Sequence, residues 1–194
     1  MIKLIVGLGN PGDNYLKTRH NAGQWFVSKL ALHFSTELKQ EKKFHGEYAK
    51  IYSAKFNGHL LFPTTFMNRS GLSVYSLCDF YNINPDEILV AHDELDIPCG
   101  SIKLKHKGGH GGHNGLRDIQ NQLNTDQYHR LRLGIGHPGD SSKVTNFVLS
   151  QPSIKEKELI DQAIDDSIFH IDDILNGNFE RAKQNLHKKY QIKQ

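Results

Sequence analysis

A short apolar run that ends in a turn decides how this chain folds: Ile2-Lys3-Leu4-Ile5-Val6-Gly7-Leu8-Gly9-Asn10-Pro11-Gly12. A continuous run of this kind is typical of a strand buried on both faces of a parallel sheet. Residues 88–93 repeat the pattern and also end in a polar stretch. Because such strands alternate with helical stretches along the chain, the sequence predicts an α/β fold.

A second stretch adds antiparallel strands to this sheet. Residues 43–56 alternate loosely and residues 59–63 form another strand-like run, with Asn57-Gly58 between them. An Asn-Gly pair between two such runs predicts a hairpin turn. Further strands are predicted over residues 101–106 and 128–136. The predicted central sheet is therefore mixed, and only partly parallel.

Helices are predicted where apolar residues recur at helical spacing. The ranges are 22–34, 72–81, a helix from 116, 153–176, and a last helix from about 179. The helix over 153–176 opens with Ser153 and Glu156, the spacing of a capping box, and we expect it to be continuous. Its possible role as a lid, and that of the basic tail around Lys188, stay open.

Length and composition limit the class of protein. The 194 residues fit one domain over 1–194, and a net charge of +3 permits a nucleic-acid partner without requiring one. Cys78 and Cys99 have no metal or redox spacing, which favours a reducing compartment. No apolar run is long enough to span a bilayer, so we expect a cytoplasmic protein with no membrane partner.

The least random stretch is Gly108-Gly-His-Gly-Gly-His-Asn-Gly115. Its glycines allow positive φ and close approach of a ligand, and a helix is expected from Leu116. The start of a helix after such a loop presents unpaired N–H groups to anions or polar substrate groups. We therefore interpret the loop as a wall of an active site; the alternative is a flexible surface loop.

Polar residues cluster where predicted strands end or helices begin. Ligands of open α/β sheets bind beyond the carboxyl ends of the strands, so these residues should converge. The set gathers histidines, a carboxylate and three asparagines: Asn10, His20, Met67, Asn68, Asp93, His113 and Asn114. A histidine that a carboxylate orients can take a proton from water, and amides can hold a substrate or an oxyanion. Since no nucleophile motif is present, the set favours hydrolysis by activated water.

Parts of the sequence are compatible with three other interpretations. His110 and His113 form H-x-x-H, but a glycine-rich loop preorganises metal ligands poorly. Gly7, Gly9 and Gly12 match a dinucleotide fingerprint, yet Pro11 interrupts it and no acidic strand end follows at the required distance. A non-catalytic RNA-binding module could instead use the basic residues of two predicted strands: Lys103, Lys105, Lys107, Arg130 and Arg132.

Six motifs, taken together, resemble those of the bacterial peptidyl-tRNA hydrolase family and occur in its order. They are Gly7-Leu-Gly-Asn-Pro-Gly12, Thr18-Arg-His-Asn-Ala-Gly23, Pro63-Thr-Thr-Phe-Met-Asn68, His92-Asp-Glu-Leu-Asp96, the stretch from Gly108 to Leu116, and the stretch from Arg132 to Gly139. The resemblance implies a mixed sheet sandwiched by helices. It also implies a cytoplasmic, monomeric esterase, without metal or cofactor, that releases peptide from the 3′-terminal ribose of tRNA.

The resemblance also implies roles for individual residues. His20, oriented by Asp93, would activate water. The asparagines Asn10, Asn68 and Asn114 would position the substrate and stabilise the oxyanion, and the remaining substrate-binding residues would be Tyr15, Phe66, Met67 and His113. The phosphates of the acceptor stem and 3′ end would bind the basic residues Lys103, Lys105 and Arg132.

Two positions depart from the family pattern. Cys99 stands where a second proline is frequent, and Lys107 stands where glycine is frequent. Neither is a predicted chemical residue. The departures bear on the local shape of the loop and on affinity for tRNA.

Overall fold

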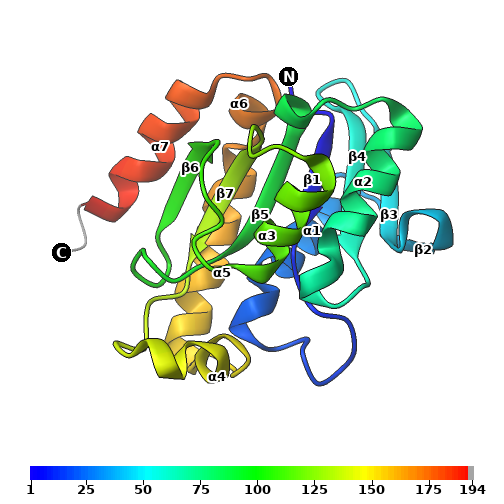
Figure 1. Cartoon of the computed structure of the whole chain (residues 1–194). Helices are drawn as coiled ribbons and strands as arrows, with labels where there is room; N and C mark the ends of the chain where they lie inside the picture. Colours follow the sequence, from blue (N-terminus) through cyan, green and yellow to red (C-terminus); the bar gives the residue numbers. More distant parts are fainter. Residues whose placement is uncertain (192–194) are drawn as a thin grey trace.

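The computed structural model describes the backbone of residues 1–191 and the side chains of residues 1–187. In this part of the chain the strands form one seven-stranded sheet, in the order β2-β3-β4-β1-β5-β7-β6 (Figure 1). The strands are β1 Leu4–Gly7, β2 Lys39–Glu41, β3 Gly46–Tyr52, β4 Asn57–Pro63, β5 Ile88–Glu94, β6 Ile102–His106 and β7 His129–Gly134. Strands β4, β1, β5 and β7 run parallel, and the outer pairs are antiparallel. The predicted mixed sheet is confirmed.

Helices cover both faces of the sheet, with α1, α5 and α6 on one face and α2 and α3 on the other (Figure 1). The α-helices are α1 Ala22–His33, α2 Ser70–Tyr81, α3 Asn114–Leu123, α4 Val144–Val148, α5 Ile154–Phe169, α6 Ile171–Leu175 and α7 Phe179–Gln191. Short 3-10 helices are η1 Arg19–Asn21, η2 Lys42–Phe44, η3 Met67–Arg69, η4 Pro85–Glu87 and η5 Ser141–Lys143. Each face buries its own apolar cluster, so the expected sandwich is confirmed.

The opening apolar run lies at the centre of the sheet. All four residues of β1 are buried, between β4 and β5. Gly7, the last residue of β1, and Gly9 leave room for α1 to pack closely against this part of the chain. A side chain on Gly7 would collide with the carbonyl oxygen of Gly23, and one on Gly9 would lie 2.9 Å from the amide of Asn21. The close contact between α1 and β1 therefore explains Gly7 and Gly9 of the weak dinucleotide fingerprint.

The predicted hairpin exists, but its turn was placed wrongly. Asn57 pairs with Tyr52 and Gly58 with Ile51, so the Asn-Gly pair lies inside β4. The turn spans residues 53–56, where the Phe56 N–H donates to the Ser53 hydroxyl at 2.9 Å. Phe56 is buried, and a Cβ on Gly58 would collide with its ring. Packing against Phe56 therefore explains this glycine better than turn geometry does.

The helix predicted over 153–176 is also wrong in one respect. Its capping box at Ser153 and Glu156 is present, but the helix breaks at His170 into α5 and α6. The break leads the chain back beside β1, where the Leu175 carbonyl accepts a hydrogen bond from Ile2 N at 3.1 Å. Helix α7 begins at Phe179, as predicted. None of the helices within residues 1–191 combines the length and apolar character that crossing a membrane requires.

Candidate active site

One cleft of about 740 Å³ lies beyond the carboxyl ends of the parallel strands. Eight of the predicted site residues line it together: Asn10, His20, Phe66, Met67, Asn68, Asp93, His113 and Asn114. They come from segments up to a hundred residues apart, and the sheet brings these segments to one edge. Tyr15 is not part of the lining, but its ring contacts that of Phe66 edge-on, with centroids 6.3 Å apart.

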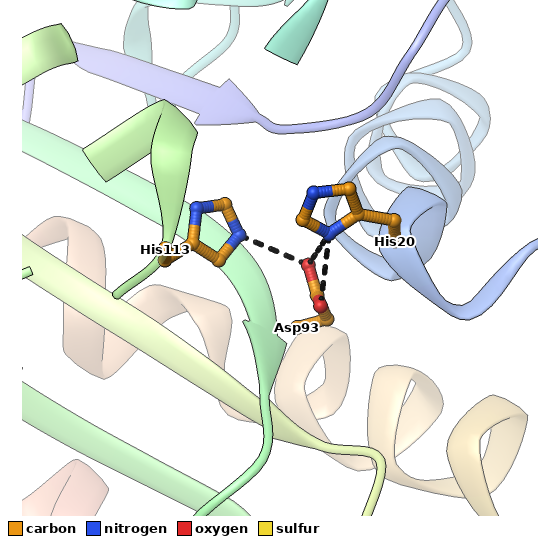
Figure 2. Close-up of side chains that lie close together, drawn as sticks. All are labelled: His20, Asp93 and His113. Atoms are coloured by element: carbon orange, nitrogen blue, oxygen red, sulfur yellow. Dashed lines mark hydrogen bonds and ion pairs between the residues drawn. The ribbon is translucent and has the colours of Figure 1, made fainter. Parts of the chain in front are cut away.

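Two histidines share the carboxylate of Asp93 (Figure 2). The Nδ1 atom of His20 lies 2.9 Å from Oδ1 and 3.0 Å from Oδ2 of Asp93. The Nε2 atom of His113 lies 3.0 Å from the same Oδ1. His20 belongs to η1 and precedes α1, Asp93 is at the end of β5, and His113 precedes α3. The carboxylate therefore bridges two loop-to-helix junctions.

The hydrogen bonds distinguish the two histidines. The backbone N–H groups of Gly115 and Leu116 donate to His113 Nδ1 at 3.2 and 3.4 Å. Since this nitrogen accepts, His113 is the neutral tautomer that donates from Nε2 to Asp93. His20 donates from Nδ1, and its Nε2 has no hydrogen-bond partner among the described residues. Of these two histidines, only His20 keeps a ring nitrogen without a hydrogen-bond partner among the described residues.

Burial and charge set the protonation of this group. Burial lowers the pKa of His20, but the charge and hydrogen bond of Asp93 outweigh it and leave the pKa above the ordinary 6.5. Burial raises the pKa of Asp93, yet its interactions with His20 and His113 hold that pKa far below the usual range. Asp93 is therefore ionised at neutral pH and favours the imidazolium form of His20.

His92, the neighbour of Asp93, is fully enclosed. Burial lowers its pKa and His113 adds to the effect, so the ring stays neutral. Its Nδ1 donates to the Asp93 carbonyl at 2.7 Å, which leaves Nε2 buried and unpaired among the described residues. The sequence indicated His92 only as a member of a motif. In the structure it supports the backbone that carries the carboxylate.

Asn10 is the best anchored of the three asparagines. Its Oδ1 accepts from Met67 N at 2.7 Å, and its backbone exchanges two hydrogen bonds of 2.9 Å with the Asn21 side chain. Its amide nitrogen is left as a free donor on the cleft, because no described residue accepts from it. Asn68 and Asn114 are exposed on the cleft, and Asn114 accepts from Arg117 at 3.1 Å.

The glycine-rich loop is fixed at its base and open at its tip. Buried Arg130 donates to the carbonyl oxygens of Gly108 and Gly109. Gly111 and Gly112 have positive φ, and a Cβ at either would meet no atom within 4 Å. Helix α3 begins at residue 114, two residues earlier than expected, with His113 as its N-cap. The loop is therefore fixed by Arg130 at Gly108 and Gly109, and it leads to the accessible first residue of α3.

The predicted phosphate-binding residues lie outside the cleft lining. Lys103 and Lys105 are exposed on β6, and Lys103 pairs in register with Arg132 of β7. Arg132 already binds Glu94, with 2.7 Å between Nε and Oε2. Arg130, grouped with these residues by sequence, is buried beneath the loop instead. The burial of Arg130 and the pairing of Arg132 with Glu94 depend on which strands and loops lie beside them, and the spacing of residues in the sequence does not specify this.

One group of the described residues has the geometry of a metal site. The facing atoms of His20, Asp93 and His113 all lie within 4.8 Å of one another. Both nitrogens facing Asp93 donate to it, so a cation bound there would have to displace two protons. His110, the other half of the H-x-x-H motif, is not in this group; its Nδ1 accepts from Gly112 N at 3.1 Å.

Known proteins are similar to this chain over almost its full length. Residues 4–194 match the family model described as peptidyl-tRNA hydrolase. The peptidyl-tRNA hydrolase of Neisseria meningitidis serogroup A, strain Z2491, is 56% identical over 97% of this chain and 98% of its own length. That of Chromohalobacter salexigens is 52% identical over 96% of both chains. The chain belongs to the peptidyl-tRNA hydrolase family.

A solved structure extends this likeness to three dimensions. The peptidyl-tRNA hydrolase of Acinetobacter baumannii matches with a TM-score of 0.92 and 47% identity, over 96% of this chain and 94% of that one. The family resemblance indicated by the sequence motifs is therefore confirmed, and membership makes the chain a hydrolase. The roles of the individual cleft residues stay predictions.

Sequence reasoning missed two parts of this hydrolase-family cleft. The first is an apolar wall from α4 and its C-terminal end, formed by Val144, Val148 and Leu149. The second is Arg19, which is buried beside it. Arg19 lies in the quoted motif around His20, so its position was visible. Its contact partners, more than a hundred residues away, were not.

Proposed function

We propose that the chain hydrolyses the ester between a peptide and the 3′-terminal ribose of tRNA, with His20 as general base. The family membership supports the substrate class. The observation that carries the residue assignment is the free Nε2 of His20, opposite an Nδ1 that donates to ionised Asp93. His113 shares the carboxylate but uses both of its ring nitrogens.

The proposed reaction has two steps. In the first, His20 Nε2 takes a proton from water as the water oxygen bonds to the ester carbonyl carbon, and the carbonyl π electrons move to oxygen. In the second, the carbonyl re-forms and the bond to the ribose oxygen breaks. That oxygen then takes the proton from His20. Asp93 stays ionised throughout and stabilises the imidazolium that forms between the steps.

The asparagines would supply donors to the developing charge. The unpaired amide nitrogen of Asn10 and the exposed amides of Asn68 and Asn114 line the cleft that holds His20. A well-placed donor contributes about 3–4 kcal/mol to stabilising an oxyanion. Phe66, Met67 and Tyr15 would contact the substrate beside them, with His113 orienting Asp93.

The nucleic-acid part of the substrate would bind along the basic strands. Lys103 and Lys105 present exposed ammonium groups on β6. Arg132 would either leave Glu94 to bind a phosphate or bind the phosphate while still paired with Glu94. Its contribution to tRNA binding should therefore depend on salt more weakly than those of Lys103 and Lys105. We infer a monomeric enzyme of the cytoplasm that acts on the acceptor stem and 3′ end of peptidyl-tRNA without metal or cofactor.

The test uses N-acetyl-aminoacyl-tRNA labelled in the acyl group, incubated with the full chain. We expect cleavage that a chelator leaves unchanged. His20→Asn should reduce kcat by about 10²–10⁴ because proton transfer is lost. His33→Asn is a matched control on the exposed end of α1 and should retain full activity. Normal turnover by the His20 variant would overturn the residue assignment, whereas tRNA binding without cleavage by the unaltered chain would favour an RNA-binding module.

A further inference from the structure

Arg19 is a buried cation immediately before the proposed base, with a side chain only 7% exposed. Its Nη1 donates to the Ser150 hydroxyl at 2.6 Å, the Ser150 carbonyl at 3.3 Å and the Phe147 carbonyl at 3.2 Å. Its Nη2 donates to Glu156 Oε2 at 3.0 Å. One side chain therefore contacts both the end of α4 and the start of α5.

Other contacts of Arg19 hold the same segment. Its backbone N–H donates to the Ser150 carbonyl at 3.1 Å. Its guanidinium carbon lies 4.1 Å from the centroid of the Phe147 ring, within the range of a cation–π contact. Glu156 also accepts from Ser153 N at 2.7 Å, so the ion pair is attached to the capping box of α5. We call these contacts of Arg19 with Phe147, Ser150 and Glu156 the Arg19 joint. The joint fixes residues 147–156 against Arg19, the residue that precedes His20.

The fixed segment supplies two of the three residues of the apolar wall of the cleft. Val148 and Leu149 both line it, and they lie between the two residues whose carbonyls Arg19 binds. On the other side of Arg19, His20 lines the cleft as well. Arg19 therefore connects the apolar wall to the base, although it is not itself part of the lining.

We propose that Arg19 is a positioning residue that sets the separation between the apolar wall of α4 and His20, and thereby the binding of the acyl side chain of the substrate. This inference rests on the proposed function. Arginine suits the task because its planar fork binds several acceptors in fixed directions, whereas lysine is a flexible point charge. A misplacement of about 1 Å in a cleft of this kind can reduce the rate roughly 10²-fold.

The variants Arg19→Gln and Arg19→Lys separate geometry from charge. We would measure kcat and KM on N-acetyl-leucyl-tRNA and N-acetyl-glycyl-tRNA, together with thermal unfolding. For Arg19→Gln we expect KM to rise about tenfold with the leucyl substrate and about twofold with the glycyl one. Arg19→Lys keeps a positive charge for Glu156 but lacks the fork, so its KM should also rise.

Two further variants serve as comparisons. Glu156→Gln removes the ion pair but can keep the capping contact, and should raise the KM ratio less than Arg19→Gln does. Arg181→Gln removes an exposed arginine whose ion pair with Asp173, at 3.4 Å, lies outside the cleft lining. Its KM for both substrates should equal that of the unaltered chain.

A purely structural role would lower kcat in proportion to the folded fraction and leave both KM values unchanged, which would overturn the proposal. If Arg19→Gln fails to fold, Arg19→Lys and Ser150→Ala decide in the same way, because each removes part of the joint. Failure of the unaltered chain to cleave either substrate would instead refute the proposed function.

Discussion

The segments around His20 and His113 are built alike but leave their histidines with different hydrogen bonds. Each places a histidine just before a helix, and both histidines donate to Asp93. In the first, tight contacts of Gly7 and Gly23 press α1 against the sheet, and the His20 Nε2 remains free. In the second, the open glycines Gly111 and Gly112 precede the histidine, and the start of α3 occupies His113 Nδ1. The comparison teaches that hydrogen bonds from the start of a helix, and not the residue type, decide which of the two histidines keeps a ring nitrogen free.

The strongest test of this comparison is Asp93→Asn, because the carboxylate serves both histidines. An amide oxygen in the place of Oδ1 could still accept from both histidines, but the amide carries no negative charge, and its N–H₂ group would replace Oδ2 and oppose the Nδ1–H of His20. We expect kcat to fall by about 10²–10⁴. Without the charge, burial would lower the pKa of His20 instead of Asp93 raising it, so the remaining activity should reach its plateau at lower pH.

The pH profile is a sensitive readout of this test. In the unaltered chain the base form of His20 accumulates above its raised pKa, so kcat should increase with pH and reach half of its maximum above pH 6.5. Profiles measured from pH 5 to pH 9 on both proteins would show the shift. Identical midpoints would contradict the role of Asp93 in setting the basicity of His20.

The tightly packed glycines and the open glycines predict losses of stability that differ in size. In Gly23→Ala the new Cβ would collide with the Ala91 carbonyl and lie 2.6 Å from Leu8 N, where backbone cannot yield. We expect a loss of about 3 kcal/mol in the free energy of unfolding. In Gly111→Ala the new Cβ would meet no neighbour, and the only cost is the φ of +56°, which an alanine adopts with strain. We expect a loss of about 1 kcal/mol in the free energy of unfolding. Urea unfolding measures both, and equal losses would contradict the distinction.

The smallest expected effect is that of His113→Asn. The proton-transfer residue is untouched, and only one of two donors to Asp93 is weakened. We expect kcat to fall about tenfold, less than in the His20 variant, with little change in KM. A loss as large as that of His20→Asn would show that the two histidines act as one unit.

The sequence predicted which segments meet better than it predicted how they meet. The runs around β1 and β5 identified parallel strands, and parallel strands share an edge, so the convergence of Asn10, Asp93 and Asn68 followed from local pattern. The shared carboxylate did not follow, because a contact of 3.0 Å depends on the angle at which α3 leaves the loop. That angle is a tertiary property.

The wrong predictions have the same origin. Asn57-Gly58 has the composition of a turn, but both residues pair within β4, and the turn lies at residues 53–56, next to the buried side chain of Phe56. Arg130, which the sequence indicated only as one of the basic residues that an RNA-binding module could use, lies instead beneath loop carbonyls that enclose it. In each case a partner distant in sequence overrides a sound local preference.

The central position of β1 also affects the order in which the chain can fold. Its two neighbours, β4 and β5, begin at residues 57 and 88. During synthesis, β1 therefore stays unpaired until about a third of the chain has been made, and it gains its second neighbour only after about half. The hydrogen bond from Ile2 to Leu175 can form only near the end of synthesis. The strand at the centre of the sheet is thus fully enclosed only after segments far along the chain have been made.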